Sequence, residues 1–166
     1  MQRTSKDYQA EVEPTMSRTY TIVANTTPAA AYAYVADLLR HPEWSAHNMK
    51  MELLTPGLVA VGSQYKAVGD LGGRPNPSTV TITAMEPDKR FAFRTQDGNS
   101  EWTHEFVFTA VDGGTRIDRI VDPFKPPPGF GIFSAIFHPF VIGPGNMKSL
   151  GMLKDRLEAG AGKPAT

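Results

Sequence analysis

The chain has 166 residues, of which 40% are hydrophobic and 20% charged, a composition that suits one folded domain and excludes wholesale disorder. Lysine plus arginine and aspartate plus glutamate both number 17, and this balance argues against nucleic acid as a partner. Without cysteine, the chain has no disulfide, no thiolate metal site and no thiol nucleophile, which suits the cytoplasm.

Both ends of the chain differ from its middle. Residues 1–16 are polar and mixed in charge and lack the apolar run of a signal peptide, so they predict a flexible N-terminal arm. Residues 161–166 predict a flexible tail, which leaves residues 17–160 as one domain. The stretch 126–147 has no acidic or basic residue, but proline and glycine break it too often to span a bilayer, so no integral membrane span is expected.

The first elements are a strand and two helical segments. Alternation predicts a strand over residues 18–24. Thr27 at the N-cap, with Pro28 at the first helical position, predicts a helix over 28–39, and residues 41–44 predict a second short helical turn. The apolar face of the longer helix is expected to contain Tyr32, Val35, Ala36 and Leu39.

The middle of the chain predicts six more strands. Turn residues join most of them closely, which favours antiparallel pairing. The glycine- and proline-rich stretch GDLGGRPNP, residues 69–77, is interpreted as a loop. The predicted strands cover residues 49–55, 62–68, 78–86, 90–96, 101–111 and 115–122.

The last element is a helix. Asn146, Leu150, Leu153 and Leu157 recur at helical spacing, and Gly160 marks the end. An apolar stripe upstream, which includes Phe133 and Phe137, is divided by proline and glycine before this helix.

A resemblance to a known family is carried by six short sequences, which occur in this order: IVANTTP (22–28), YVADLLRHPEW (34–44), VGSQY (61–65), EPDKR (86–90), DGGTRI (112–117) and LGMLKDRLEAG (150–160). With them, the chain resembles the SRPBCC superfamily, which includes START domains, birch-pollen-allergen-like proteins and polyketide cyclase/dehydratase-type domains. The resemblance implies an α+β helix-grip fold over residues 18–160. In that fold a seven-stranded curved antiparallel sheet wraps a long C-terminal helix, with two short helices between strands 1 and 2, and a cavity lies between sheet and helix.

The strand 101–111 supplies the main candidates for a site. Trp102, His104, Phe106 and Phe108 share one face by alternation, and the implied cavity would lie on that side. His104 is interpreted either as a group that orients a ligand or moves a proton, or as a hydrogen-bonded histidine of the interior.

Other candidates depend on register or on the final helix. On the strand 115–122, either Asp118 and Asp122 face inward, or Ile117, Arg119 and Val121 do, depending on the hairpin register. Asp122 is favoured as a partner for His104 near the cavity end. Tyr65 is expected to fix a polar end of a ligand or to pack in the core. Phe133, Phe137 and Met147 face the cavity if the final helix does.

The sequence predicts no metal site and no cofactor. His41 and His47 are the only close histidine pair, and no phosphate or dinucleotide fingerprint is present. Three functions stay open. The first is binding of a small hydrophobic or aromatic molecule as a carrier or sequestering protein, and the second is a polyketide cyclase, aromatase or dehydratase-type reaction with His104 as the proton-transfer group. The third, implied by the heat-shock-protein-activator branch of the superfamily, is a protein-interaction domain that uses the segment 126–144. The oligomeric state is not predicted.

Overall fold

The computed structural model describes residues 17–71, 73–98, 100–125, 129, 132 and 143–160. The predicted arm, the predicted tail and the side chains of Phe133 and Phe137 lie outside the described residues.

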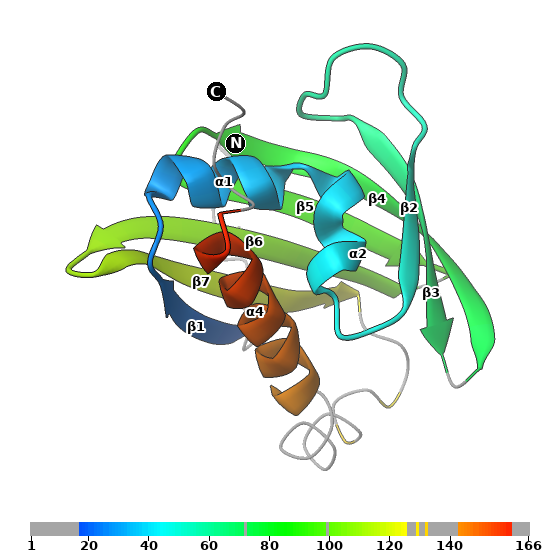
Figure 1. Ribbon diagram of the computed structural model, residues 1–166. Coiled ribbons are helices and arrows are strands. Elements are labelled where there is room, and N and C mark those ends of the chain that lie inside the picture. The colour runs from blue at the N-terminus through cyan, green and yellow to red at the C-terminus, as the bar shows by residue number, and fades with distance from the viewer. Residues whose placement is uncertain are drawn as a thin grey trace, which may run out of the picture.

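One seven-stranded antiparallel sheet forms the frame, in the order β1-β7-β6-β5-β4-β3-β2. The predicted α+β helix-grip fold is confirmed, because this sheet curves around the C-terminal helix (Figure 1). The strands are β1 Arg18–Ala24, β2 Met49–Leu53, β3 Gln64–Leu71, β4 Arg74–Glu86, β5 Arg90–Asp97, β6 Ser100–Val111 and β7 Gly114–Lys125.

The helices of the first half are shorter than predicted. α1 covers Pro28–Ala36, and the Thr27 hydroxyl accepts a hydrogen bond from the Ala30 N–H at 3.2 Å, as the N-cap pattern predicts. The predicted continuation to residue 39 is wrong, because Asp37 leaves the helical conformation and caps the 3₁₀ turn η1, Leu38–Arg40. This break buries Leu38 and leaves Leu39 exposed, the reverse of the expected apolar face. α2, His41–Trp44, follows as predicted.

The glycine- and proline-rich stretch 69–77 is a hairpin and not a loop. β3 and β4 pair through to Leu71 and Arg74. β4 pairs with β5 only from Thr79 onward. Pro75 and Pro77 therefore fit in β4, because their missing N–H groups interrupt no hydrogen bonds between these two strands.

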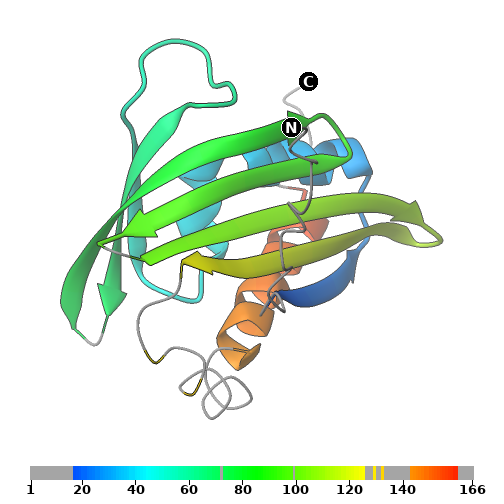
Figure 2. The same cartoon turned by 180° about the vertical axis from the view of Figure 1, so that it is seen from behind.

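The concave face of the sheet carries all the helices described (Figure 1), and the view from behind shows the strands in front of them (Figure 2). α4, Gly143–Glu158, buries Leu150, Leu153 and Leu157 against the sheet. The Lys154 ammonium donates to the Val23 carbonyl at 2.8 Å, and Glu158 accepts from the Asn25 N–H at 3.0 Å. These two bonds fix the end of α4 beside the end of β1.

Candidate functional site

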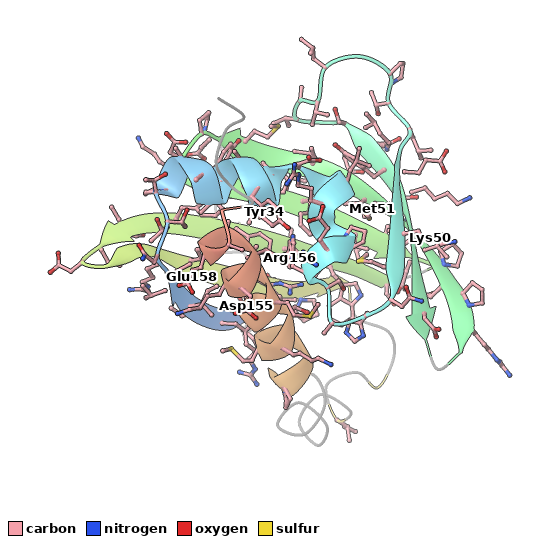
Figure 3. The ribbon with its side chains drawn as sticks, in the orientation of Figure 1. Tyr34, Lys50, Met51, Asp155, Arg156 and Glu158 are labelled. Carbon is pink, nitrogen blue, oxygen red and sulfur yellow. The ribbon has the colours of Figure 1, made fainter. Side chains whose placement is uncertain are left out.

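A cavity of about 360 Å³ lies between the concave face of the sheet, α2 and the first turns of α4. Its size falls in the range of roughly 300–1,000 Å³ that is usual for small-molecule sites. Strands β2 to β7 all contribute to its wall. On β2, Met51 lines the cavity and the adjacent Lys50 is exposed, as alternation requires; both are labelled in Figure 3.

The apolar wall consists of aromatic, methionine and valine side chains. Cross-strand pairing places Phe93 of β5 beside His104 of β6, and Thr95 beside Trp102. The side chains that make the wall apolar are Met49, Met51, Val80, Phe93, Trp102 and Val121.

Two histidines stack with aromatic rings at one side of this wall. His41 lies on Trp44 with ring centroids 4.1 Å apart, and His104 lies on Phe93 with centroids 4.8 Å apart. Burial lowers the pKa of His41 to about 3, and the positive charge of Arg119 adds to this effect. Burial, and then Arg119 and His41, lower the pKa of His104 well below its usual value. Both rings are therefore neutral at pH 7.

Arg119 of β7 also lines the cavity and is only 8% exposed. Register places it opposite Phe106 on β6 and Tyr20 on β1, and its guanidinium carbon lies 5.7 Å from the centre of the Phe106 ring. Burial lowers the pKa of Arg119 to about 10, and Tyr20 offsets this effect only in part. The side chain therefore keeps its positive charge at pH 7.

The first turns of α4 close the cavity on the side of Arg119. Gly145, Asn146 and Ser149 belong to its lining. The Ser149 hydroxyl donates to the Gly145 carbonyl at 3.1 Å and accepts from the Ala46 N–H at 2.9 Å. It thereby connects α4 to the segment after α2, and the two helices hold one wall of the cavity together.

The opposite end of the cavity, on β3 to β5, is polar and acidic. Asp97 accepts a hydrogen bond from the Asn76 amide at 3.2 Å, and Asp70 lies nearby on β3. Ser78 and Thr95 complete this end. The cavity therefore has a cationic end, an apolar middle and an acidic end.

The structure divides the predicted site residues into two groups. Trp102 and His104 line the cavity, whereas Phe106 and Phe108 of the same face are buried in the core with Leu150 and Leu153. Tyr65 also belongs to the core and does not reach the cavity lining. Met147 is 44% exposed and lies outside the lining, and Phe133 and Phe137 lie outside the described residues.

Asp122 does not meet His104. In the β6–β7 register, His104 pairs with Val121 and Thr103 pairs with Asp122, so the aspartate lies on the other face of the sheet. Asp118 is on that face too, where it accepts from the Thr21 hydroxyl at 2.6 Å and pairs with Arg116 at 2.9 Å. The parity favoured from the sequence is therefore wrong, and the inward residues of β7 are Ile117, Arg119 and Val121.

Sequence reasoning left Arg119 in the parity that it did not favour, and it did not place His41, His47 or the α4 residues Gly145, Asn146 and Ser149 in the lining. For Arg119 a signal was available, because register can be counted from the turn at Asp112 and Gly113. With Val111 opposite Gly114, counting outward pairs Phe106 with Arg119.

Within the described ranges, no group of three or more His, Asp or Glu side chains is placed to hold a metal ion. None of the helices in the described part of the chain is long and apolar enough to cross a membrane.

The chain is similar to known proteins in structure, and its sequence matches a protein family. In solved structures the chain is similar to the Zhui aromatase/cyclase from Streptomyces sp. R1128, with 17% identity, a TM-score of 0.63, and 88% of this chain and 98% of that chain covered. It is similar to a START superfamily protein from Mycobacterium smegmatis, with 13% identity, a TM-score of 0.67, and 86% and 97% covered. Protein TTHA0849 from Thermus thermophilus shares 16% identity at a TM-score of 0.68, with 86% and 97% covered.

Because these sequence identities are low, the structural similarity is evidence for the fold alone. No curated protein sequence matches the chain. The family model described as polyketide cyclase/dehydrase and lipid transport matches residues 15–158. The chain therefore belongs to the polyketide cyclase/dehydrase and lipid transport family, the branch of the SRPBCC superfamily that its sequence resembles.

Proposed function

We propose that this protein binds a small hydrophobic or aromatic molecule in the cavity between its sheet and α4, as a carrier or a sequestering protein. The observation that carries the proposal is the cavity of about 360 Å³, which has Trp102 and Phe93 at its wall and lies beside a core of buried side chains. An apolar ligand would remove this wall from water, and each Å² of apolar surface buried contributes about 25 cal/mol to the free energy of binding.

Isothermal titration calorimetry with a panel of fatty alcohols, fatty acids and polyphenols tests this proposal. The variant Ser78→Phe places a phenyl group in the cavity, because Ser78 lines it and is only partly buried, so the new ring has room. Binding of any panel member by the wild type should weaken at least tenfold in this variant.

The matched control is Thr79→Phe, at the neighbouring exposed residue of β4 on the other face of the sheet. It should bind as the wild type does. If no panel member binds to the wild type, or if Ser78→Phe binds as tightly as the control, the ligand site is not this cavity and the proposal fails.

A second candidate is a cyclase or dehydratase-type reaction, favoured by the neutral His104 ring in the cavity. A neutral imidazole is the form that accepts a proton, as a general base must. His104 would act without Asp122, which faces the other way. A His104→Ala variant that keeps full turnover on a substrate converted by the wild type would exclude this role.

Two other predictions have less support. Most of the segment 126–144, on which a protein-interaction role would depend, lies outside the described residues. The cytoplasmic location rests on the cysteine-free composition.

A further inference from the structure

Arg119 is a buried cation whose charge is not matched by the residues described around it. No described carboxylate forms an ion pair with it, and its Nε atom is buried without a hydrogen-bond partner in the described part of the chain. The adjacent Asp118 faces away and is held by Thr21 and Arg116. A buried charge is ordinarily paired, because moving it out of water costs several kcal/mol.

Among the described residues, the neighbours of Arg119 do not supply a negative charge. His41 and His104 are neutral, and the phenol of Tyr20 is neutral because burial raises its pKa above the usual 10.0. The acidic residues of the cavity, Asp70 and Asp97, belong to β3 and β5, and Asp97 is already engaged by Asn76.

The start of α4 adds a second feature that favours an anion at the same end. α4 is a 16-residue helix with no acidic residue in its first turn, and its Gly145 and Asn146 line the cavity. Asn146 hydrogen-bonds Tyr20, which is the cross-strand neighbour of Arg119, so the helix start and the guanidinium lie together. Figure 1 shows α4 crossing the sheet at β1 and β7. The free N–H groups and the dipole of a helix start attract negative charge.

We propose that this end of the cavity binds the carboxylate of an apolar ligand, with the acid group on the guanidinium of Arg119 and the apolar body against Phe93 and Trp102. The inference rests on the proposed binding function and specifies the ligand class as apolar monoacids. A guanidinium matches a carboxylate with two parallel hydrogen bonds. One cation balances one negative charge, so a carboxylate fits better than a phosphate dianion.

The acidic end of the cavity sets the direction of the ligand. Asp97 and Asp70 would repel a second carboxylate, and they would accept hydrogen bonds from a ligand hydroxyl or amide N–H, to which Asn76 could also hydrogen-bond. A ligand with an acid at one end and a neutral polar group at the other would therefore bind in a single orientation.

Matched acids and amides of the same shape test the proposal by calorimetry. The pairs are 2-naphthoic acid with 2-naphthamide and decanoic acid with decanamide, and 2-naphthyl phosphate is the phosphate probe. The wild type should bind each acid at least tenfold more tightly than its amide, and more tightly than the phosphate. Arg119→Met should abolish the preference for the acid and retain amide binding.

Arg116→Met is the matched control, because it removes a cation from the exposed face of the same strand. It should keep the acid preference at 0.15 M salt, where charges separated by more than about 8 Å are screened. Thermal unfolding checks that Arg119→Met is folded, and this variant should be at least as stable as the wild type. Arg119→Lys, which keeps the charge but not the forked donors, should retain part of the preference.

The outcomes separate this inference from the proposed function. Equal binding of acids and amides by the wild type would overturn the carboxylate inference and leave the binding function standing. Tighter binding of the phosphate, or an acid preference that survives in Arg119→Met, would also overturn it. If no probe binds at all, the proposed function fails and this inference fails with it.

Discussion

His41 and His104, the two cavity histidines that stack with aromatic rings, stay neutral in the folded protein because burial and Arg119 oppose their protonation. In the unfolded chain a histidine has its ordinary pKa of about 6.5. Between that value and about 3, the folded pKa of His41, the unfolded state binds more protons than the folded state. Stability is therefore expected to fall as the pH drops below 6.5, and the histidines contribute no pH dependence above it.

Urea unfolding at pH 7, 6 and 5 measures this effect. Each histidine should contribute a slope of up to about 1.4 kcal/mol per pH unit below its unfolded pKa. The double variant His41→Gln and His104→Gln should lose this part of the slope, and His47→Gln, at an exposed position, should keep it. A wild-type stability that is flat from pH 7 to pH 5, or a double variant with an unchanged slope, would contradict the neutral histidines.

At the same scale, alternation in the sequence located only part of the site. It correctly placed Trp102, His104, Phe106 and Phe108 on the inner face, but alternation does not reveal where along a strand the open space lies. Tyr32 of α1 fills the space over Phe108, with ring centroids 5.9 Å apart. Trp44 of α2 packs on Phe106, with ring centroids 5.9 Å apart, so on β6 only His104 and Trp102 belong to the cavity lining. The packing of helices distant in the sequence decides this.

At the scale of elements, the hairpin between β6 and β7 depends on the glycine that follows its turn. Gly114 has φ +140°, and a Cβ at this position would overlap the carbonyl oxygen of Ala24. Gly114→Ala is therefore expected to lower the free energy of unfolding by at least about 2 kcal/mol, because the clash with rigid backbone adds to the strain of the positive φ. Chemical denaturation measures the change.

Gly113→Ala is the matched control for this prediction. Gly113 also has a positive φ, of +84°, but a Cβ there would meet nothing within 4 Å. It should cost about 1–2 kcal/mol, the strain of the left-handed conformation alone. If both alanine variants lose the same stability, the close approach of Gly114 to β1 is not a constraint on the hairpin.

Element boundaries were predictable where local chemistry sets them. The Thr27 cap and the turns that follow Glu86 and Val111 gave the start of α1 and the ends of β4 and β6. Residues 69–77 were missed because glycine and proline usually interrupt strands, and only the free edge of β4 in this region admits Pro75 and Pro77. The end of the first helix was missed because Asp37 caps a new turn in the middle of a continuous apolar pattern.

For the whole molecule, the family resemblance implied a cavity, and the structure has one beside α2 and the first turns of α4. α1 and the C-terminal half of α4 fill the other end with a packed core that contains Leu150, Leu153 and Leu157. The cationic charge of Arg119 stands at the boundary between the two halves, beside Phe106 of the core and within the cavity lining. Ligand binding at this boundary would therefore be coupled to the stability of the whole fold.

Thermal unfolding with 2-naphthoic acid tests this coupling. A ligand that binds only the folded state, at a free concentration 100 times its Kd, adds about 2.7 kcal/mol to the free energy of unfolding. For a chain of this size, each kcal/mol raises Tm by about 2–4 °C, so the wild type should gain about 5–11 °C. Ser78→Phe, which is expected to bind at least tenfold more weakly, should gain at most about half of this shift, and Thr79→Phe should gain as much as the wild type. If Ser78→Phe showed the full shift, the acid would be binding elsewhere on the folded chain, because a site that a cavity-filling side chain leaves intact does not lie between the sheet and α4.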